Sequence, residues 1–492
     1  MTLRSFTEQQ TYRLDDLSNA FGVDTSKAKD ILQRLILIGA AKIAKSEIPA
    51  IWENDDSPDG FIWDNLARDL FFTITFVGII EIDGYTLKCY PKFIKDRIPG
   101  PSDLRPILQA IERYNADHTE LNLTVDSSPR IRNRLALGLA ILRDYFSHGL
   151  YVHQREELNL HGQGEIDWET SISTTTPLIR NNRPYYFDYF TNDIRQDDTD
   201  YISRLHACII TECSKKLHAC ELDEILQLEA PTLYNGERID FGTNDYICQR
   251  LRGEINIQFV SHKQMLLRNL LAWIENAEMA TGTSGIRMFG TNTFHVLWET
   301  MCAEVFESQY THTLNSLGVA LDSTFNSGDT LESLICKPKW QATIGGSPHE
   351  AMKTLRPDYI RIVKDTDRNH FVILDAKYYN IELDENHVSG QPGVEDVSKQ
   401  YLYHLAYKDF IRVHGMNPIN AFISPSDQSV SSVVGKAMMP IFSNLPAIRV
   451  VKLSASKILR NYNNHTHLSL QEEIPALFSD FDSRIPVEGS VV

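Results

Sequence analysis

Two groups of charged residues in the C-terminal half of the chain have the types and spacing of a hydrolytic metal site. They are Arg356-Pro357-Asp358 and Asp375-Ala376-Lys377, and sixteen residues separate the two aspartates. Each group adjoins an apolar, strand-like run, and the polar stretch 364–369 lies between the runs, as expected for a β-hairpin. Asp375 and Lys377 would share one face of a strand, about 7 Å apart at their backbones. Hairpin pairing can bring the first aspartate beside them.

Two carboxylates beside one ammonium group suit Mg²⁺, for which Mn²⁺ could substitute. Magnesium prefers a few carboxylate oxygens together with water and substrate phosphate oxygens. Asp358, Asp375 and the main-chain carbonyl of Ala376 could supply the protein ligands, and Lys377 would orient or deprotonate the attacking water. Such a metal lowers the pKa of bound water and neutralises charge on a phosphorane, so the pattern predicts phosphodiester hydrolysis. The alternative is that the aspartates only form ion pairs with Arg356 and Lys377.

The segments on either side of this hairpin are predicted to be helical. Between Thr293 and Tyr310 large apolar residues recur at helical spacing, and Glu299 and Glu304 flank the apolar stripe. Either glutamate could lean toward the hairpin as a third metal-facing carboxylate. Downstream, 390–393 breaks the chain and 394–410 resumes as a helix that carries Gln400 and Tyr403. Apolar runs at 421–424 and 447–453 predict further strands.

In this order the parts resemble the PD-(D/E)XK nuclease superfamily. The resemblance implies a mixed α/β protein with an α-β-β-β-α-β nuclease core, and it favours Glu299, in Trp298-Glu299, over Glu304 as the upstream acid. It implies catalytic roles for Glu299, Asp358, Asp375, Lys377 and Gln400, with Glu299, Asp358, Asp375 and Ala376 as the metal ligands.

Composition limits the setting of such a site. At 492 residues the chain is expected to form two or three domains. Its net charge of −17 is unfavourable for contacts with phosphates, so any DNA contact must be local and delivery of DNA would depend on a partner. No run approaches the roughly 18 apolar residues of a membrane span, the first residues do not read as a signal peptide, and the seven cysteines are scattered. We expect a cytoplasmic protein with reduced thiols and no membrane contact.

The N-terminal segment has the pattern of a winged helix-turn-helix. Two helices are predicted, at 14–21 and 25–38, with Asp24 as the cap of the second. Lys27 and Arg34 on the second helix could reach DNA in the major groove, although Asp24 and Asp30 oppose this. The same fold serves equally for contacts with a protein partner or for dimerisation, so both interpretations stay open.

The middle of the chain predicts mixed α and β structure. The segments 71–82 and 85–90 read as a hairpin that turns at Asp83-Gly84. The aromatic segment 181–189, near Arg180, could stack on nucleic acid, but packing in a core strand is favoured. No Gly-x4-Gly-Lys-Ser/Thr sequence occurs, so this chain is not expected to hydrolyse nucleotides itself. The stretch 51–69 reads as a linker that leads into a helix, and the small residues at 281–285 predict a domain boundary.

Over nearly its whole length the chain is similar to McrC-like or LlaJI-type restriction endonuclease subunits, through Tyr90-Pro91-Lys92, 164–168 and the nuclease motifs. The resemblance implies antiphage defence, in which an AAA+ GTPase of the McrB type recognises or translocates double-stranded DNA. This subunit would cut both strands when two active sites converge, so nuclease domains could dimerise. Together with the patterns above, we expect three regions: a winged helix-turn-helix-like module (1–50), a mixed α/β region for partner and DNA binding (51–280) and a PD-(D/E)XK nuclease domain (281–492). Two alternatives are a catalytically silent subunit that activates the NTPase and a stand-alone DNA-repair nuclease.

Overall fold

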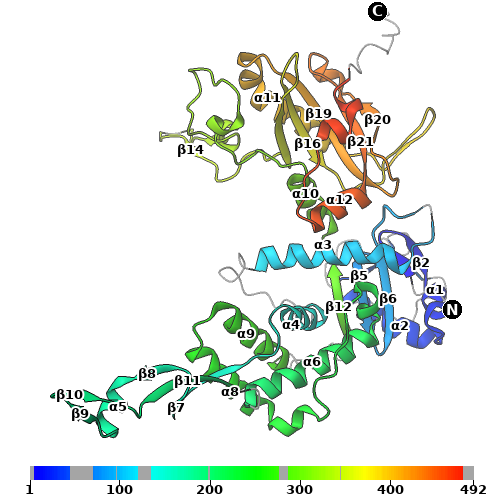
Figure 1. The fold of residues 1–492 in the computed structure, drawn as a ribbon. Helices are drawn as coiled ribbons and strands as arrows, with labels where there is room; N and C mark the ends of the chain where they lie inside the picture. The colour runs from blue at the N-terminus through cyan, green and yellow to red at the C-terminus, as the bar shows by residue number, and fades with distance from the viewer. Residues whose placement is uncertain are drawn as a thin grey trace, which may run out of the picture. The chain divides into compact units, whose positions relative to one another are not determined.

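The C-terminal part of the chain is built around a five-stranded mixed sheet. In the computed structural model the strand order is β15-β16-β19-β21-β20 (Figure 1). β16, β19 and β21 run parallel, whereas the two outer strands are antiparallel to their neighbours. All seven residues of β16 are buried, as is usual for a strand covered on both faces. The strands are β15 (Tyr359–Val363), β16 (His370–Ala376), β19 (Asn417–Ser426), β20 (Ser432–Ala437) and β21 (Ile448–Ser454).

Three helices accompany this sheet: α10 (Phe294–Val305), α11 (Val394–Val413) and α12 (Ala455–Asn463). Tyr407 and Phe410 of α11 pack in one apolar cluster with Phe371 and Ile373 of β16. The element order differs from the expected α-β-β-β-α-β, because two strands of the sheet precede α11 and three follow it. The segment after β16 does not add a strand to the sheet: it forms a separate two-stranded ribbon, β17 (Glu382–Leu383) and β18 (Val388–Ser389).

The N-terminal segment contains the two expected helices, α1 (Leu14–Phe21) and α2 (Thr25–Leu37). The side chain of Asp24 accepts a hydrogen bond from the main chain of Lys27, as predicted for an N-cap. A small antiparallel sheet accompanies the helices, in the order β2-β4-β3. Its strands are β2 (Thr11–Arg13), β4 (Phe71–Ile74) and β3 (Ala41–Ile43).

A second N-terminal sheet has the order β1-β6-β5-β12, in which β1 runs parallel to β6. Asp83 and Gly84 form the turn between β5 and β6, and both have positive φ, as the predicted hairpin requires. The strands are β1 (Ser5–Thr7), β5 (Val77–Ile82), β6 (Tyr85–Tyr90) and β12 (Ile286–Thr291).

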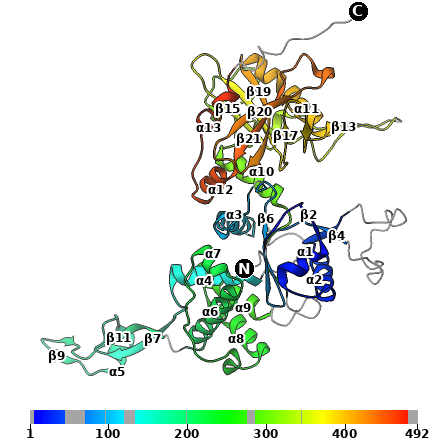
Figure 2. The ribbon, with the colours of Figure 1, turned by 90° about the vertical axis from the view of Figure 1, so that its right-hand side faces the viewer.

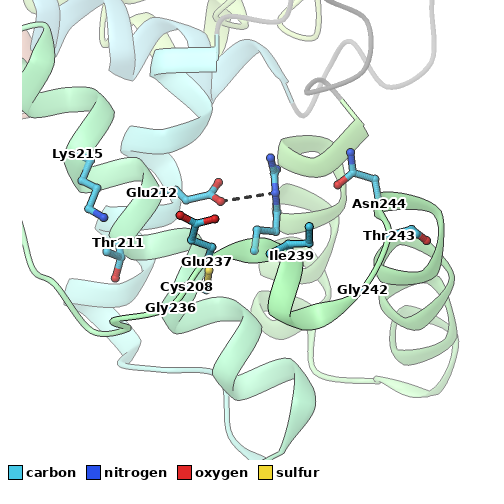
Figure 3. A pocket seen from close by; sticks show the side chains of 11 residues that line it. Cys208, Thr211, Glu212, Lys215, Gly236, Glu237, Ile239, Gly242, Thr243 and Asn244 are labelled. Atoms are coloured by element: carbon cyan, nitrogen blue, oxygen red, sulfur yellow. Dashed lines mark ion pairs between the residues drawn. The ribbon is translucent and has the colours of Figure 1, made fainter.

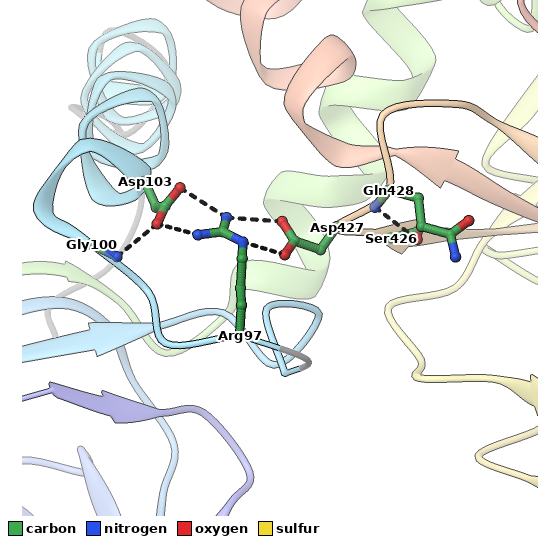
Figure 4. Close-up of polar contacts among 6 residues, drawn as sticks. All are labelled: Arg97, Gly100, Asp103, Ser426, Asp427 and Gln428. Carbon is green, nitrogen blue, oxygen red and sulfur yellow. Dashed lines mark hydrogen bonds and ion pairs between the residues drawn. The ribbon is translucent and has the colours of Figure 1, made fainter.

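One arginine connects the start of α3 (Pro101–Thr119) to the loop after β19. The guanidinium of Arg97 donates to both oxygens of Asp103, at 2.6 and 2.8 Å, and to both oxygens of Asp427, at 2.7 and 3.0 Å (Figure 4). Arg97 holds the pKa of Asp103 below its usual value, chiefly through these hydrogen bonds. α3 also contacts α12, where the amide of Asn463 donates to the carbonyl of Pro106.

The structure describes residues 5–44, 70–95, 97–119, 134–197, 200–275, 286–343 and 345–479. They fall into two compact units, the first made of 1–79, 87–126 and 290–492, and the second of 80–86 and 127–289. The predicted linker at 51–69, the small-residue boundary at 281–285 and the domain limits at 50 and 280 lie outside the described residues. Among the described helices, none is both long and apolar enough to cross a membrane.

The second unit combines helices with a long β-arm. Figure 2 shows β7, β11, α5 and β9 extending away from the helices of this unit. The arm holds a sheet of order β7-β11-β8 and a separate β9-β10 pair. Its elements are β7 (His153–Leu160), β8 (Glu165–Asp167), α5 (Trp168–Thr174), β9 (Leu178–Arg180), β10 (Arg183–Tyr185) and β11 (Phe190–Asp197). The helices include α4 (Arg134–His148), α6 (Tyr201–Ala219), α8 (Asn244–Ile257) and α9 (Ser261–Glu275).

The arm overturns the expectation that the aromatic segment 181–189 packs in a core. Tyr185 is 47% exposed and Phe187 is 68% exposed, and Arg180 and Arg183 are exposed as well. The reason is that β9 and β10 form only a two-stranded ribbon, and their side chains are exposed in the described part of the chain.

Candidate active site at the end of the central strands

The β15–β16 hairpin brings the two predicted aspartates together. Its antiparallel register pairs Tyr359 with Leu374, so Asp358, one residue before β15, lies beside Asp375. Asp358 Oδ2 accepts from the main-chain N–H of Ala376 at 2.9 Å, and Asp375 is close enough to raise the pKa of Asp358. Asp375 is only 4% exposed. The hairpin and the convergence of the acidic side chains are therefore present as the spacing predicts.

The electrostatics of the paired acids are those of crowded carboxylates. Burial raises the pKa of Asp358 to about 8, and the hydrogen bond and negative charge of Asp375 add to this effect. Burial also raises the pKa of Glu299, where the charge of Lys377 opposes the shift and that of Asp375 adds to it. Below the site, burial raises the pKa of the Cys302 thiol. Carboxylates crowded in this way favour a cation among them.

Lys377 is held between two carboxylates. Its Nζ lies 2.9 Å from Asp375 Oδ2 and 3.0 Å from Asp396 Oδ1. Burial lowers the pKa of Lys377, but the two carboxylates outweigh it and the net pKa is raised. Asp396, in the first turn of α11, was not among the residues singled out from the sequence. Its only signal there is its place as an acid at a helix N-terminus, which is common on structural grounds alone.

The structure distinguishes between the two candidate glutamates of α10. Glu299 lines a cavity of about 350 Å³ together with Ala376 and Lys377. Glu304 instead forms an ion pair with Arg113 of α3. Glu299 is thus the acid that reaches the site, in agreement with the preferred assignment. Among the described residues, no three His, Cys, Asp or Glu side chains stand close enough to hold a metal ion, so Glu299 as a direct ligand stays a prediction.

Gln400 lies beneath the site and not in the cavity. It is fully buried on α11, and its Nε2 donates to the carbonyl of Ile373 at 3.0 Å. Tyr403, one turn further along α11, donates to the carbonyl of Arg356 at 3.0 Å. Both side chains bind main-chain atoms next to the two aspartate motifs. They fix the positions of the hairpin strands, whereas a catalytic role for Gln400 stays a prediction.

The two residues proposed to touch DNA from the N-terminal helix are engaged with a neighbouring acid. Lys27 Nζ lies 3.1 Å from Asp30 Oδ2, and Arg34 lies 3.8 Å from the same oxygen. This carboxylate reduces the positive charge that α2 presents. Neither residue lines the cavity that contains Lys377.

The second unit has a separate cavity of about 680 Å³, between α6 and the start of α8 (Figure 3). Glu212 and Arg238 form an ion pair across it at 3.5 Å, and Glu212 also accepts from the indole of Trp273 at 3.0 Å. Thr243, on its rim, caps α8. The acidic and basic groups of this cavity already neutralise each other, so the cavity has no distinct preference for a charged ligand.

Comparison with known protein families adds a decisive observation. The family model of the LlaJI restriction endonuclease matches residues 76–456, which is most of the chain. The chain belongs to this family. The chain is also similar to the type II restriction enzyme BsuMI component YdjA of Bacillus subtilis (strain 168). The two are 25% identical over 414 residues, which cover 82% of this chain and 83% of that protein. The LlaJI-type assignment made from the sequence is confirmed.

Two solved structures show a more distant likeness to this LlaJI-family chain. One is a half-complex from a tetradecameric assembly of Thermococcus gammatolerans McrB AAA+ hexamers with bound McrC. It is 12% identical with a TM-score of 0.37, and the match covers 94% of this chain and 98% of that one. The other, the McrBC complex of the same organism, is 13% identical with a TM-score of 0.23 and covers 55% and 79%. At these scores the likeness carries no argument about partners.

Proposed function

We propose that this chain is the DNA-cleaving subunit of a restriction system, a Mg²⁺-dependent endonuclease that hydrolyses phosphodiester bonds. The observation that carries the proposal is the convergence of Asp358 and Asp375 beside Lys377 at the end of β15 and β16. Membership of a restriction endonuclease family supports the choice of DNA as substrate.

The donor chemistry at the site fits Mg²⁺. This ion is usually held by one or two protein carboxylates, with water and substrate phosphates completing its shell. Asp358 and Asp375 would hold it, together with the carbonyl of Ala376, and Glu299 is the nearby acid that could join them. When bound, the ion would lower the pKa of a water molecule and neutralise charge on the phosphate.

The residues of the chain have separable roles in this proposal. Lys377 carries three N–H donors, and Asp375 and Asp396 take two of them at 2.9 and 3.0 Å. The third is left for the attacking water or a phosphate oxygen. We therefore assign Lys377 the role of orienting that group and not the role of general base. Gln400 and Tyr403 keep the strand ends in place through their bonds to Ile373 and Arg356.

The proposal includes a separate AAA+ GTPase partner of the McrB type. The chain contains no Gly-x4-Gly-Lys-Ser/Thr sequence, so a nucleotide-driven system would need another subunit. The acidic net charge of −17 likewise suits an enzyme to which a partner delivers the DNA. A pair of these subunits would make a double-strand break.

The test is plasmid cleavage by the chain with its AAA+ partner, GTP or ATP, and Mg²⁺, with each component omitted in turn. Asp375→Ala should reduce cleavage to the background rate and leave partner binding intact, because it removes one of the two paired carboxylates. The matched control is Asp367→Ala, at an exposed position in the turn of the same hairpin. Equal cleavage by wild type and Asp375→Ala would refute the proposal. Cleavage without partner or nucleotide would instead indicate a stand-alone nuclease.

A second candidate function is that of a catalytically silent subunit that activates the partner NTPase, and one observation favours it. Lys377 is paired on both sides, and no group of three metal-binding side chains occurs among the residues described. In that case neither the wild type nor Asp375→Ala would cut DNA, and both would stimulate the partner's NTPase equally. Measuring GTP hydrolysis and plasmid cleavage on the same samples separates the two functions.

A further inference from the structure

The cavity that contains Lys377 has a wall made by the N-terminal segment of the chain. Part of its lining is Ala376, the last residue of β16, the following residues Lys377 and Tyr378, and Glu299 of α10. Other lining residues come from the N-terminal segment and from the chain just after β6, and they are Glu8, Gln9, Lys42, Thr75 and Lys92. Sequence reasoning assigned none of these five residues to the site.

A buried polar cluster fixes this wall to the catalytic strand. The hydroxyl of Tyr378 donates to Glu8 Oε2 at 2.5 Å and accepts from the main-chain N–H of Lys92 at 3.3 Å. The ammonium of Lys92 lies 4.4 Å from the ring centroid of Tyr378 and donates to Gln9 at 2.9 Å. Asn380 closes the cluster by donating to the carbonyl of Lys92 at 2.8 Å. Since Tyr378 directly follows Lys377, the wall and the catalytic lysine are held in register.

The turn just before the strand that carries Lys42 lies near the residues that precede α10. A Cβ built on Gly39 would stand 3.9 Å from the amide nitrogen of Asn292, two residues before α10. Thr75 holds this segment through its hydroxyl, which donates to the carbonyl of Gly39 at 2.8 Å. Lys42 is exposed at the cavity, and among the described residues it forms no ion pair.

Lys42 therefore differs from Lys27 on α2 of the same segment. Lys27 is paired with Asp30 and lines no part of the cavity. Among the residues that the structure describes Lys42 forms no ion pair, and an exposed ammonium group in the cavity that contains Lys377 suits a backbone phosphate.

We propose that Lys42 binds a DNA backbone phosphate next to the phosphate that is cut. The N-terminal segment then forms part of the DNA-binding surface through its sheet and not through α2. This inference rests on the proposed nuclease function, because it needs DNA to lie at Lys377. The cluster of Glu8, Tyr378 and Lys92 lies in the same cavity, and β3 holds Lys42 there by pairing it with Thr73 of β4.

The test measures binding of a short labelled DNA duplex to the full-length Asp375→Ala chain in Mg²⁺, over a range of about 50 to 200 mM salt. Lys42→Gln should weaken binding and reduce the slope of log affinity against log salt by about 0.9, the value for one lost phosphate contact. Lys27→Gln makes the same charge change on α2 and should leave the slope unaltered. Both positions are at the surface, so neither substitution removes core packing.

Three results would overturn the inference. The first is an unchanged slope for Lys42→Gln. The second is a decrease in slope for Lys27→Gln that equals or exceeds the decrease for Lys42→Gln. The third is the absence of duplex binding by the Asp375→Ala chain at the lowest salt. Because the binding assay needs no cutting, its failure can be told apart from a failure of the proposed function. If the wild-type complex cuts DNA and Lys42→Gln binds DNA normally, only this inference is refuted. If DNA binds through Lys42 and the complex does not cut it, only the proposed nuclease function is refuted.

Discussion

The geometry around Lys377 shows how much a single residue's role depends on tertiary structure. The motif Asp375-Ala376-Lys377 predicts one acid beside the ammonium group, because alternate residues of a strand share a face. The second acid, Asp396, comes from a helix nineteen residues further along the chain. In the sequence it reads as one of two acids in a helix's first turn, and Glu395 next to it has the same appearance. Only the packing of α11 against β16 distinguishes the two.

Asp396→Asn should slow DNA cleavage about tenfold to a hundredfold, the range typical of residues that orient a catalytic group. Asp375 would still pair with Lys377, so activity should fall without being abolished. The measurement is the single-turnover rate of plasmid cleavage in the complete system. The control Glu395→Gln, at an exposed position in the same helical turn, should cut at the wild-type rate. Equal rates for both variants would remove Asp396 from the site.

At the scale of elements, local patterns predict what lies within one hairpin or one helix. The β15–β16 hairpin and the helices α10 and α11 all appear close to their predicted positions, because their signals are periodicity and turn residues. Which of Glu299 and Glu304 faces the site depends on the position of Arg113 in α3, and no sequence period contains that information. The contact of Glu8 with Tyr378 joins segments 370 residues apart and could not be predicted from local sequence patterns either.

Tyr378→Phe should destabilise the protein, because it leaves the buried carboxylate of Glu8 without the donor that Tyr378 supplies. Loss of a hydrogen bond to a buried group costs about 1–3 kcal/mol, which should appear as a lower urea midpoint with an unchanged slope. Tyr379→Phe removes the neighbouring hydroxyl, which forms no hydrogen bond in this cluster among the described residues, and serves as the control. A midpoint shift shared by both variants would contradict this account.

The pH dependence of this effect has a definite sign. Burial raises the pKa of Glu8, while the hydrogen bond from Tyr378 lowers it. Removing the hydroxyl should therefore raise the pKa of Glu8 further, because it destabilises only the ionised form of Glu8 in the folded protein. The difference in unfolding free energy between wild type and Tyr378→Phe should be largest at neutral pH and shrink as the pH falls and Glu8 becomes protonated.

At the scale of the whole molecule, composition predicts class but not arrangement. A mixed α/β protein was expected and is found, but the exposure of the aromatic segment on the arm was not foreseen. Aromatic residues favour strands for packing reasons, and the sequence does not reveal that the side chains of β9 and β10 are exposed in the described part of the chain. The position of Lys42 in the cavity that contains Lys377 is likewise a property of assembled segments and not of any local pattern.

The bridge formed by Arg97 is the connection between distant segments that is most directly testable by stability. Arg97→Gln removes both fork-shaped contacts and leaves Asp103 and Asp427 facing each other (Figure 4). The arginine side chain is 44% exposed, so solvent screens these pairs and the loss should be about 1 kcal/mol or less. Arg412→Gln, which breaks a more exposed pair with Asp409, should change the unfolding free energy by a smaller amount.

Acid should remove the difference made by Arg97. The pKa of Asp103 is held below its ordinary value of 3.8 in the folded protein, so the ion pair contributes stability above that pH and loses it as the pH falls through the folded-state pKa. Urea unfolding at neutral pH should therefore separate Arg97→Gln from wild type, and the two curves should converge in acid below pH 3.8. A difference that stays constant or grows as the pH falls would show that Arg97 stabilises the protein by packing and not through its carboxylate partners.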